Sequence, residues 1–134
     1  MEKFSVITTV YNSESYLRGC LENVLSQSYP DIEHVIIDGG STDGTLAILQ
    51  EYSEKFPDRI KYISEPDDGP CDAWNKGLEM AGGTVVGWLG SDDLYYPETV
   101  SIVMDHFLRN PEWFFLYGEC MQIDEVGRDV ALDR

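Results

Sequence analysis

The chain has 134 residues, of which 43% are hydrophobic and 12% aromatic, and its 25 acidic and 9 basic residues give a formal net charge of −16. This size and composition predict one globular domain with one hydrophobic core. The acidity is spread over both halves of the chain, and it excludes nucleic acid as a partner because affinity for a phosphate backbone comes from clustered Lys and Arg.

Strands are expected to alternate with helices along the whole chain. Short runs rich in β-branched and apolar residues predict the strands, and apolar residues spaced three and four apart predict the helices. The expected strands are residues 4–10, 32–38, 59–65, 84–90 and 112–118. A hairpin with its turn at Gly127 is expected near the end of the chain.

Four helices are expected between these strands. Asn12 or Ser13 is expected to cap the first, which ends at the segment SYPD. The second follows STDGT, with Asp43 as its expected cap, and stops before Pro57. The third and fourth begin at prolines, which suit the first turn of a helix. These helix-starting residues are Pro70 and Pro97.

The alternation predicts an α/β fold with a doubly wound, mostly parallel sheet and helices on both faces. Such sheets bind ligands outside the carboxyl ends of their strands, so the segments that follow the strands are the candidate site. These segments are TVYN (9–12), DGGSTDG (38–44), EPDDGP (65–70) and GSDD (90–93). Five of their six aspartates and one tyrosine are expected to converge at a single edge. The six residues are Tyr11, Asp38, Asp67, Asp68, Asp92 and Asp93.

Some of these aspartates are expected to be structural and others to contact a ligand. Asp68 precedes a helix and is expected to serve as a cap or turn residue. Asp38 lies five residues before the next helix with Gly39 and Gly40 behind it, an arrangement that allows close approach of a ligand to the backbone. We therefore expect Asp38 to contact a ligand.

The pair Asp92–Asp93 follows the segment WLGS, which we expect to end a buried strand. Adjacent carboxylates repel one another, and no Lys or Arg occurs between Gly77 and His106. A hard divalent cation held by carboxylate oxygens, with substrate phosphates completing its shell, would resolve this repulsion. The pair is also too early to cap the helix expected at Pro97.

Other chemistries fit the sequence poorly. It lacks the G-x-x-x-x-G-K-[ST] phosphate loop, the G-x-G-x-x-G dinucleotide motif and the G-x-S-x-G elbow. His34 and His106 are expected to be a strand residue and a helix-surface residue. A nucleotidylyltransferase would need a Gly- and Arg-rich loop after the first strand, and a phospho-acceptor receiver domain would need an acidic pair there. The sequence has neither.

Four ordered segments resemble the family 2 glycosyltransferases of GT-A fold. They are VITTVYN, DGGSTDGT, EPDDGPCDAWNKG and GWLGSDD, and the resemblance extends from residue 4 to about residue 118. It implies a nucleotide-sugar-binding segment in which Tyr11 lies near the base and Asp38 hydrogen-bonds it, with Asp67 also close. Thr9 stands at a backbone contact where many relatives have proline. Asn75 and Gly77 match a family pattern on the third helix, where a packing role is equally consistent.

The segment GSDD resembles the family's variant of the D-x-D motif. By that match Asp92 contacts the ribose or the sugar, and Asp93 coordinates Mn²⁺ or Mg²⁺ bridging the diphosphate. Ser91 replaces the first carboxylate of a strict D-x-D. The resemblance thus implies a divalent metal cofactor.

The resemblance implies transfer of a hexose from a nucleotide diphosphate sugar, expected to be UDP-linked, to an acceptor hydroxyl, with inversion. Cell-surface polysaccharide biosynthesis is the expected setting, with a glycan or a lipid-linked molecule as acceptor. The family's general base is expected beyond Arg134, so residues 1–134 are expected to be one domain truncated after its donor-binding half. The alternative is a non-catalytic nucleotide- or metal-binding module.

Three cysteines, Cys20, Cys71 and Cys120, form no C-x-x-C pair and indicate reduced thiols. The apolar run near the N-terminus is too short for a signal peptide or a transmembrane helix. We therefore expect a cytoplasmic location without a transmembrane segment in this chain, and leave open peripheral attachment at the inner membrane face.

Overall fold

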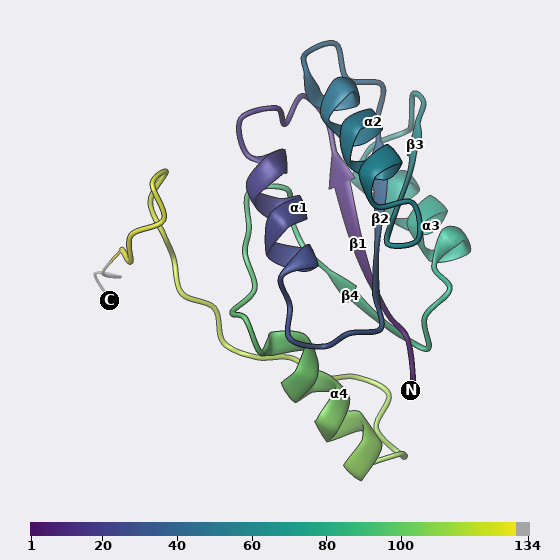
Figure 1. Ribbon diagram of the computed structural model, residues 1–134, viewed down its shortest axis with the longest axis vertical. Helices are drawn as coiled ribbons and strands as arrows, with labels where there is room; N and C mark the ends of the chain where they lie inside the picture. Colours follow the sequence, from purple (N-terminus) through teal and green to yellow (C-terminus); the bar gives the residue numbers. More distant parts are fainter. Residues whose placement is uncertain (131–134) are drawn as a thin grey trace.

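The computed structural model describes residues 1–130, which form one four-stranded sheet flanked by helices (Figure 1). All strand pairs are parallel, in the order β3-β2-β1-β4. The strands are β1 (Phe4–Val10), β2 (Ile32–Asp38), β3 (Ile60–Ser64) and β4 (Val85–Trp88). The helices are α1 (Leu17–Leu25), α2 (Thr45–Lys55), α3 (Pro70–Met80) and α4 (Thr99–Arg109).

Strand β1 is central, and its register places the strand ends that carry the site. It pairs with β2 from Phe4↔Ile32 to Val10↔Asp38, and with β4 from Phe4↔Val85 onward. Strands β1 and β2 are buried on both faces, as parallel strands usually are, and they bury five polar or charged residues beside their apolar ones. The predicted parallel α/β fold is confirmed.

Alternate residues of the strands divide the core between the two faces of the sheet. On one face, α1 and α2 bury Leu21 and Leu49 against Val10 and Ile36. Helix α4 joins the same face through Met104, which belongs to the cluster around Phe4 and Val24. On the other face, α3 packs Ala73 against Ile7, Val35 and Ile37. Helices therefore cover both faces, as the alternating sequence predicted.

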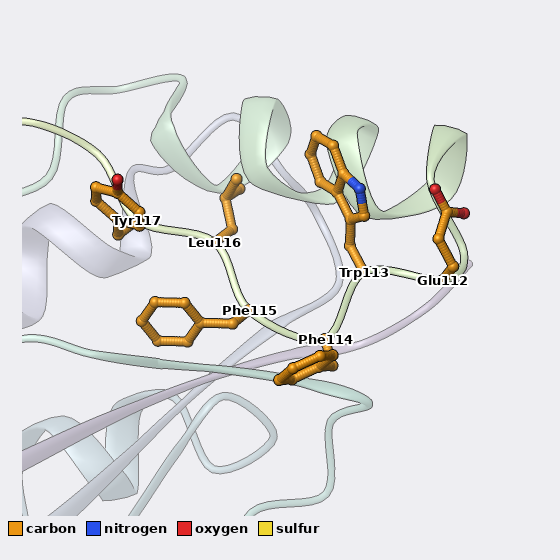
Figure 2. Close-up of a pocket in the computed structure, with 6 residues that line it drawn as sticks. All are labelled: Glu112, Trp113, Phe114, Phe115, Leu116 and Tyr117. Carbon is orange, nitrogen blue, oxygen red and sulfur yellow. The ribbon is translucent and has the colours of Figure 1, made fainter.

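The predicted fifth strand, residues 112–118, is wrong for this structure. The segment pairs with no strand of the described chain, and Phe114 is 95% exposed. Figure 2 shows Trp113 directed toward α4, where it stacks on His106, and Phe114 directed away from it. The segment lines a small hollow of its own and also one side of the broad groove that Asp92 and Asp93 line. An apolar run becomes a strand only where a neighbouring strand supplies hydrogen-bond partners.

Several predicted helix starts also need correction. Asn12 and Ser13 do not cap α1 with their side chains; its N-cap is Tyr16, and the backbone carbonyl of Ser13 accepts the N–H groups of Tyr16 at 3.2 Å and Leu17 at 3.0 Å. Helix α4 begins at Thr99 rather than at Pro97. At the start of α4, the Tyr96 carbonyl accepts the N–H of Thr99 at 3.0 Å and Gln27 Oε1 accepts the N–H of Val100 at 3.2 Å, so these donors have partners.

The remaining local predictions concern Asp43, Asp68 and the hairpin at Gly127. The N-cap of α2 is Gly44 and not Asp43, but the Asp43 carboxylate accepts the N–H of Thr45 at 2.9 Å and so satisfies a donor at the start of α2. Asp68 lies in the bend before α3, where the acceptors are its neighbours: Asp67 accepts the Gly69 N–H and Asp72 accepts the Asp68 N–H, each at 3.0 Å. An antiparallel bridge between Ile123 and Asp129 confirms the hairpin around Gly127. Among residues 1–130, no helix is both long enough and apolar enough to cross a membrane.

Candidate nucleotide and metal site

Hydrogen bonds tie together the loops that follow the strands at the carboxyl edge of the sheet. The backbone N–H of Asn12 donates to Ser41 Oγ at 2.8 Å, and Ser91 Oγ lies 3.1 Å from Ser13 Oγ. Asn12 has a φ of 50°, which Asn tolerates, and its Oδ1 accepts the N–H of Thr42 at 2.8 Å. The loops after β1, β2 and β4 are therefore linked into one unit.

Asp38 is fully buried at the end of β2 and anchors this unit. One of its oxygens accepts the Ser64 hydroxyl at 2.6 Å and the Ser41 N–H at 3.1 Å, and the other accepts the Ser41 hydroxyl. The sequence analysis selected Asp38 as a candidate site residue, but it did not predict that the hydrogen bonds of Asp38 connect two loops. A carboxylate offers about four acceptor positions, of which three are occupied here.

Asp67, Thr9 and Tyr11 lie around the same end of the sheet. Asp67 Oδ1 accepts the Gly69 N–H at 3.0 Å, and its other oxygen lies 3.0 Å from where a Cβ on Gly39 would be. Gly39 thus allows the Asp67 carboxylate to reach the loop that follows Asp38. Thr9 is partly exposed near the end of β1, and the Tyr11 ring, 62% exposed, is open to solvent.

Asp92 and Asp93 are exposed in the turn that follows β4, and they line a broad groove. Within residues 1–130, neither carboxylate accepts a hydrogen bond or joins an ion pair. The backbone N–H of Asp93 donates to the Gly90 carbonyl at 3.1 Å and closes the turn. The expectation of a buried strand end is wrong in part: Leu89 is buried, but Trp88 is 61% exposed because β4 pairs with β1 alone among the described strands.

The donor set of this turn suits a hard divalent cation shared with a phosphate. No cluster of three or more His, Cys, Asp or Glu side chains able to hold a metal occurs in the described part of the chain. Magnesium-type sites commonly use one or two carboxylates and take their other ligands from water and substrate phosphates. Two adjacent, uncompensated carboxylates fit that chemistry.

A row of buried polar side chains lies beneath the turn, and the sequence analysis did not predict it. His34 Nε2 lies 2.6 Å from Thr8 Oγ1, and burial lowers the pKa of His34 to about 3, so the ring is neutral. Cys20 is 1% exposed, with its Sγ 4.0 Å from Thr8 Oγ1 and 3.6 Å from the Gly90 carbonyl oxygen. Residues 20 and 90 are 70 positions apart, so no local sequence signal could have joined them.

A parallel α/β sheet with acidic loops joined at its carboxyl edge defines a ligand-binding protein of the doubly wound class. The family model described as "Glycosyl transferase family 2" matches residues 5–127, so the chain belongs to glycosyl transferase family 2. This confirms the resemblance found in the sequence.

Two curated relatives are similar to this chain in sequence. The chain is 35% identical over 127 residues to chondroitin synthase of Escherichia coli, an alignment that covers 95% of this chain and 18% of that protein. It is 38% identical over 133 residues to an uncharacterised glycosyltransferase of Nostoc sp., covering 98% and 40% of the two chains. The chain therefore spans less than half the length of either relative.

Two solved structures share the fold. S. aureus TarS 1–349 in complex with UDP-GlcNAc superimposes with a TM-score of 0.72 at 32% identity, over 81% of this chain and 32% of that one. The mannosyltransferase PcManGT from Pyrobaculum calidifontis, in complex with GDP-Man and Mn²⁺, gives a TM-score of 0.73 at 28% identity, over 79% and 32%. The relatives are glycosyltransferases, and these neighbours were captured with nucleotide sugars.

Proposed function

We propose that this chain is the donor-binding part of a glycosyltransferase, and that it binds a nucleoside diphosphate sugar together with Mn²⁺ or Mg²⁺ at the carboxyl edge of the sheet. The observation that carries the proposal is the exposed, uncompensated pair Asp92–Asp93 in the turn after β4, on an edge whose loops are already joined by hydrogen bonds. Family membership and the nucleotide sugars bound by the structural neighbours support it.

We assign the base end of the donor to the loops after β1 and β2. Tyr11 offers an exposed ring for stacking, and Thr9 and Asp67 lie on the same edge. We assign the remaining acceptor position of Asp38 to an N–H of the base; because the side chain is fully buried, this contact requires the loop that carries Ser41 to open. UDP is our first choice of nucleotide, and GDP is the competitor because one neighbour holds GDP-Man.

We assign the diphosphate end to the turn after β4. Asp93 would hold the cation and Asp92 would contact the ribose or the sugar. When bound, the cation neutralises the charge that develops on the departing diphosphate. The residues of this chain then bind and orient the donor.

For the parent protein we propose transfer of a hexose, with inversion, to a glycan or lipid-linked hydroxyl in cell-surface polysaccharide synthesis. Inversion by direct displacement needs a general base, and no residue of this chain is assigned that role. Residues 1–134 would be the donor-binding part of this domain. The cytoplasmic location and the peripheral attachment at the inner membrane face stay predictions.

A non-catalytic module that binds a nucleotide or a metal is the second candidate. The exposed carboxylate pair Asp92–Asp93 would serve a bound nucleotide and cation in such a module as well. The two candidates share the same binding site, so they differ only in whether the parent protein turns over a donor.

Calorimetric titration of the chain with UDP and with GDP, with and without Mn²⁺, tests the site. We expect Mn²⁺-dependent nucleotide binding that Asp93→Ala weakens by more than roughly tenfold, about 1.4 kcal/mol, because the substitution removes a cation ligand. UDP is expected to bind more tightly than GDP.

Asp58→Ala is the matched control, because it removes the same charge from an exposed position at the opposite edge of the sheet, before β3. It should leave the affinity unchanged. Nucleotide affinity that is indifferent to Mn²⁺, to EDTA and to Asp93→Ala would overturn the metal role of this turn.

A further inference from the structure

We propose that Cys20 is a positioning residue for the turn from Gly90 to Asp93: its buried thiol holds the Gly90 carbonyl from beneath and thereby sets where the Asp93 carboxylate lies. The effect on ligand binding rests on the proposed function, whereas the effect on the turn itself does not.

The thiol lies between the sheet and the turn. Cys20 projects from α1 and is 1% exposed, with its Sγ 3.6 Å from the carbonyl oxygen of Gly90. On its other side Sγ lies 4.0 Å from Thr8 Oγ1, and Thr8 in turn lies 2.6 Å from His34 Nε2. Three buried polar side chains from β2, β1 and α1 thus lead to one backbone oxygen of the site.

That backbone oxygen also closes the turn. The Gly90 carbonyl accepts the N–H of Asp93 at 3.1 Å, so the thiol and the turn share one acceptor. The Asp93 carboxylate is folded back over Gly90, with Oδ2 only 2.5 Å from where a Cβ on Gly90 would lie. A shift of the Gly90 peptide therefore moves the carboxylate. On the outer side, Ser13 holds Ser91 at 3.1 Å.

The thiol is protonated and can act as a donor at neutral pH. Burial is the main cause that raises the pKa of Cys20 to about 12; the Thr8 hydrogen bond opposes it, and the charges of Asp93 and Asp92 add to it. A buried S–H is a weak donor, and the Gly90 carbonyl is an acceptor within its reach. Among the described residues, the other side-chain hydrogen bond to this turn joins Ser91 to Ser13 on its outer side, so removing the thiol removes the contact on its inner side.

Cys20→Ala and Cys20→Ser, made in the full chain, test the proposal with two measurements. The first is amide hydrogen exchange at Asp93 without ligand, which reports opening of the turn. The second is Mn²⁺-dependent affinity for UDP by calorimetry. We expect Cys20→Ala to speed exchange at Asp93 and to weaken UDP binding, each roughly fivefold, as for loss of one hydrogen bond. Cys20→Ser keeps a donor and is expected to stay within about twofold of wild type.

Val24→Ala is the packing control. Val24 lies one turn further along α1 in the same apolar cluster, and its side chain has no polar group. We expect it to lower the free energy of unfolding without changing exchange at Asp93 or UDP affinity, so lost packing can be told from a lost donor. Cys120→Ala, at an exposed thiol, should change none of these quantities.

The outcomes separate the two proposals. If wild type lacks Mn²⁺-dependent binding but Cys20→Ala still accelerates exchange at Asp93, the proposed function fails and the positioning role stands. If exchange at Asp93 is the same in wild type and Cys20→Ala, or if Val24→Ala accelerates it equally, the positioning role is wrong.

Discussion

Gly90 shows how one missing side chain can decide the geometry of this site. A Cβ there would lie 2.5 Å from Asp93 Oδ2 and 3.3 Å from Asp92 Oδ1. These atoms are the ends of exposed, flexible side chains, so a larger residue would move the carboxylates at little cost to the fold. At Gly77 the same test meets Ile7 Cγ2 in the core at 2.5 Å, and the cost would fall on packing instead.

Gly90→Ala should therefore separate binding from stability. We expect Mn²⁺-dependent UDP affinity to fall about five- to tenfold because the Asp93 carboxylate is displaced. The free energy of unfolding should change by less than about 1 kcal/mol. Calorimetry and urea denaturation measure the two quantities.

Gly19→Ala is the matched control, because a Cβ there meets no atom within 4 Å and the position is helical. It should stabilise the protein slightly and leave affinity unchanged. Equal affinities for wild type and Gly90→Ala would show that the position of the Asp93 carboxylate does not matter.

At the scale of elements, a buried carboxylate joins the turn between α3 and β4 to the amino end of the sheet. Glu33 on β2 is 1% exposed and accepts the Ser5 hydroxyl and the Gly82 N–H, each at 2.6 Å. Lys61 Nζ lies 2.7 Å from its other oxygen. Strand β4 begins just after this turn, so Glu33 fixes the start of the strand that delivers Asp92 and Asp93.

The pKa of Glu33 gives this contact a pH dependence. Burial acts to raise its pKa, but Lys61, Ser5 and the Gly82 N–H outweigh burial and hold it below its ordinary value of 4.5. A lowered pKa in the folded state means that the ionised group stabilises the fold at pH values above 4.5. This contribution is lost as the pH falls through the folded-state pKa.

Glu33→Gln should therefore lower the free energy of unfolding at pH 7 by about 1–3 kcal/mol. Its difference from wild type should shrink as the pH falls below 4.5, because the wild-type carboxyl then takes up a proton. Urea denaturation at a series of pH values measures this. Glu54→Gln is the matched control, because it makes the same charge change at an exposed position of α2. A wild-type-to-variant difference that stays constant with pH would contradict the assignment.

At the scale of the whole molecule, the net charge of −16 sets the electrostatic character of the chain. Nine basic residues cannot pair with 25 acidic ones, so the folded state carries net self-repulsion. A field of this sign also repels an anionic donor, which strengthens the case for a cation that arrives with the phosphates.

Screening this repulsion should stabilise the chain. We expect the melting temperature to rise by about 3–6 °C between about 20 mM and about 300 mM NaCl, a range over which the Debye length falls below 10 Å. Scanning calorimetry measures the shift. Choline chloride at equal ionic strength should give the same rise, because screening does not depend on the identity of the cation. A melting temperature that is flat or falls with salt would count against self-repulsion.

Much of the fold was predictable because periodicity is local. The spacing of Leu17, Leu21 and Val24 predicted α1, and the β-branched run 4–10 predicted β1 within its observed bounds. Residues 112–118 have an equally strong strand pattern, yet they pair with no described strand. A strand depends on a neighbour, and a local pattern cannot say whether one is present.

The candidate site, too, could be predicted from the sequence only in part. Asp38, Asp67, Asp92 and Asp93 could be selected from the sequence because strand ends of a parallel sheet share one edge. The hydrogen bonds of Ser41 and Ser64 to the buried Asp38 could not be predicted from the sequence, because those contacts depend on how two loops fold over one another.

The sequence by itself determined the α/β class, the family and the aspartates that follow the strands, since each depends on residue type and spacing along the chain. Only the tertiary structure decided the strand order β3-β2-β1-β4, the exposure of Trp88 and the thiol contact between Cys20 and Gly90. These features join residues far apart in the chain, and the free energy of packing and hydrogen bonding that fixes them exists only once the sheet has formed.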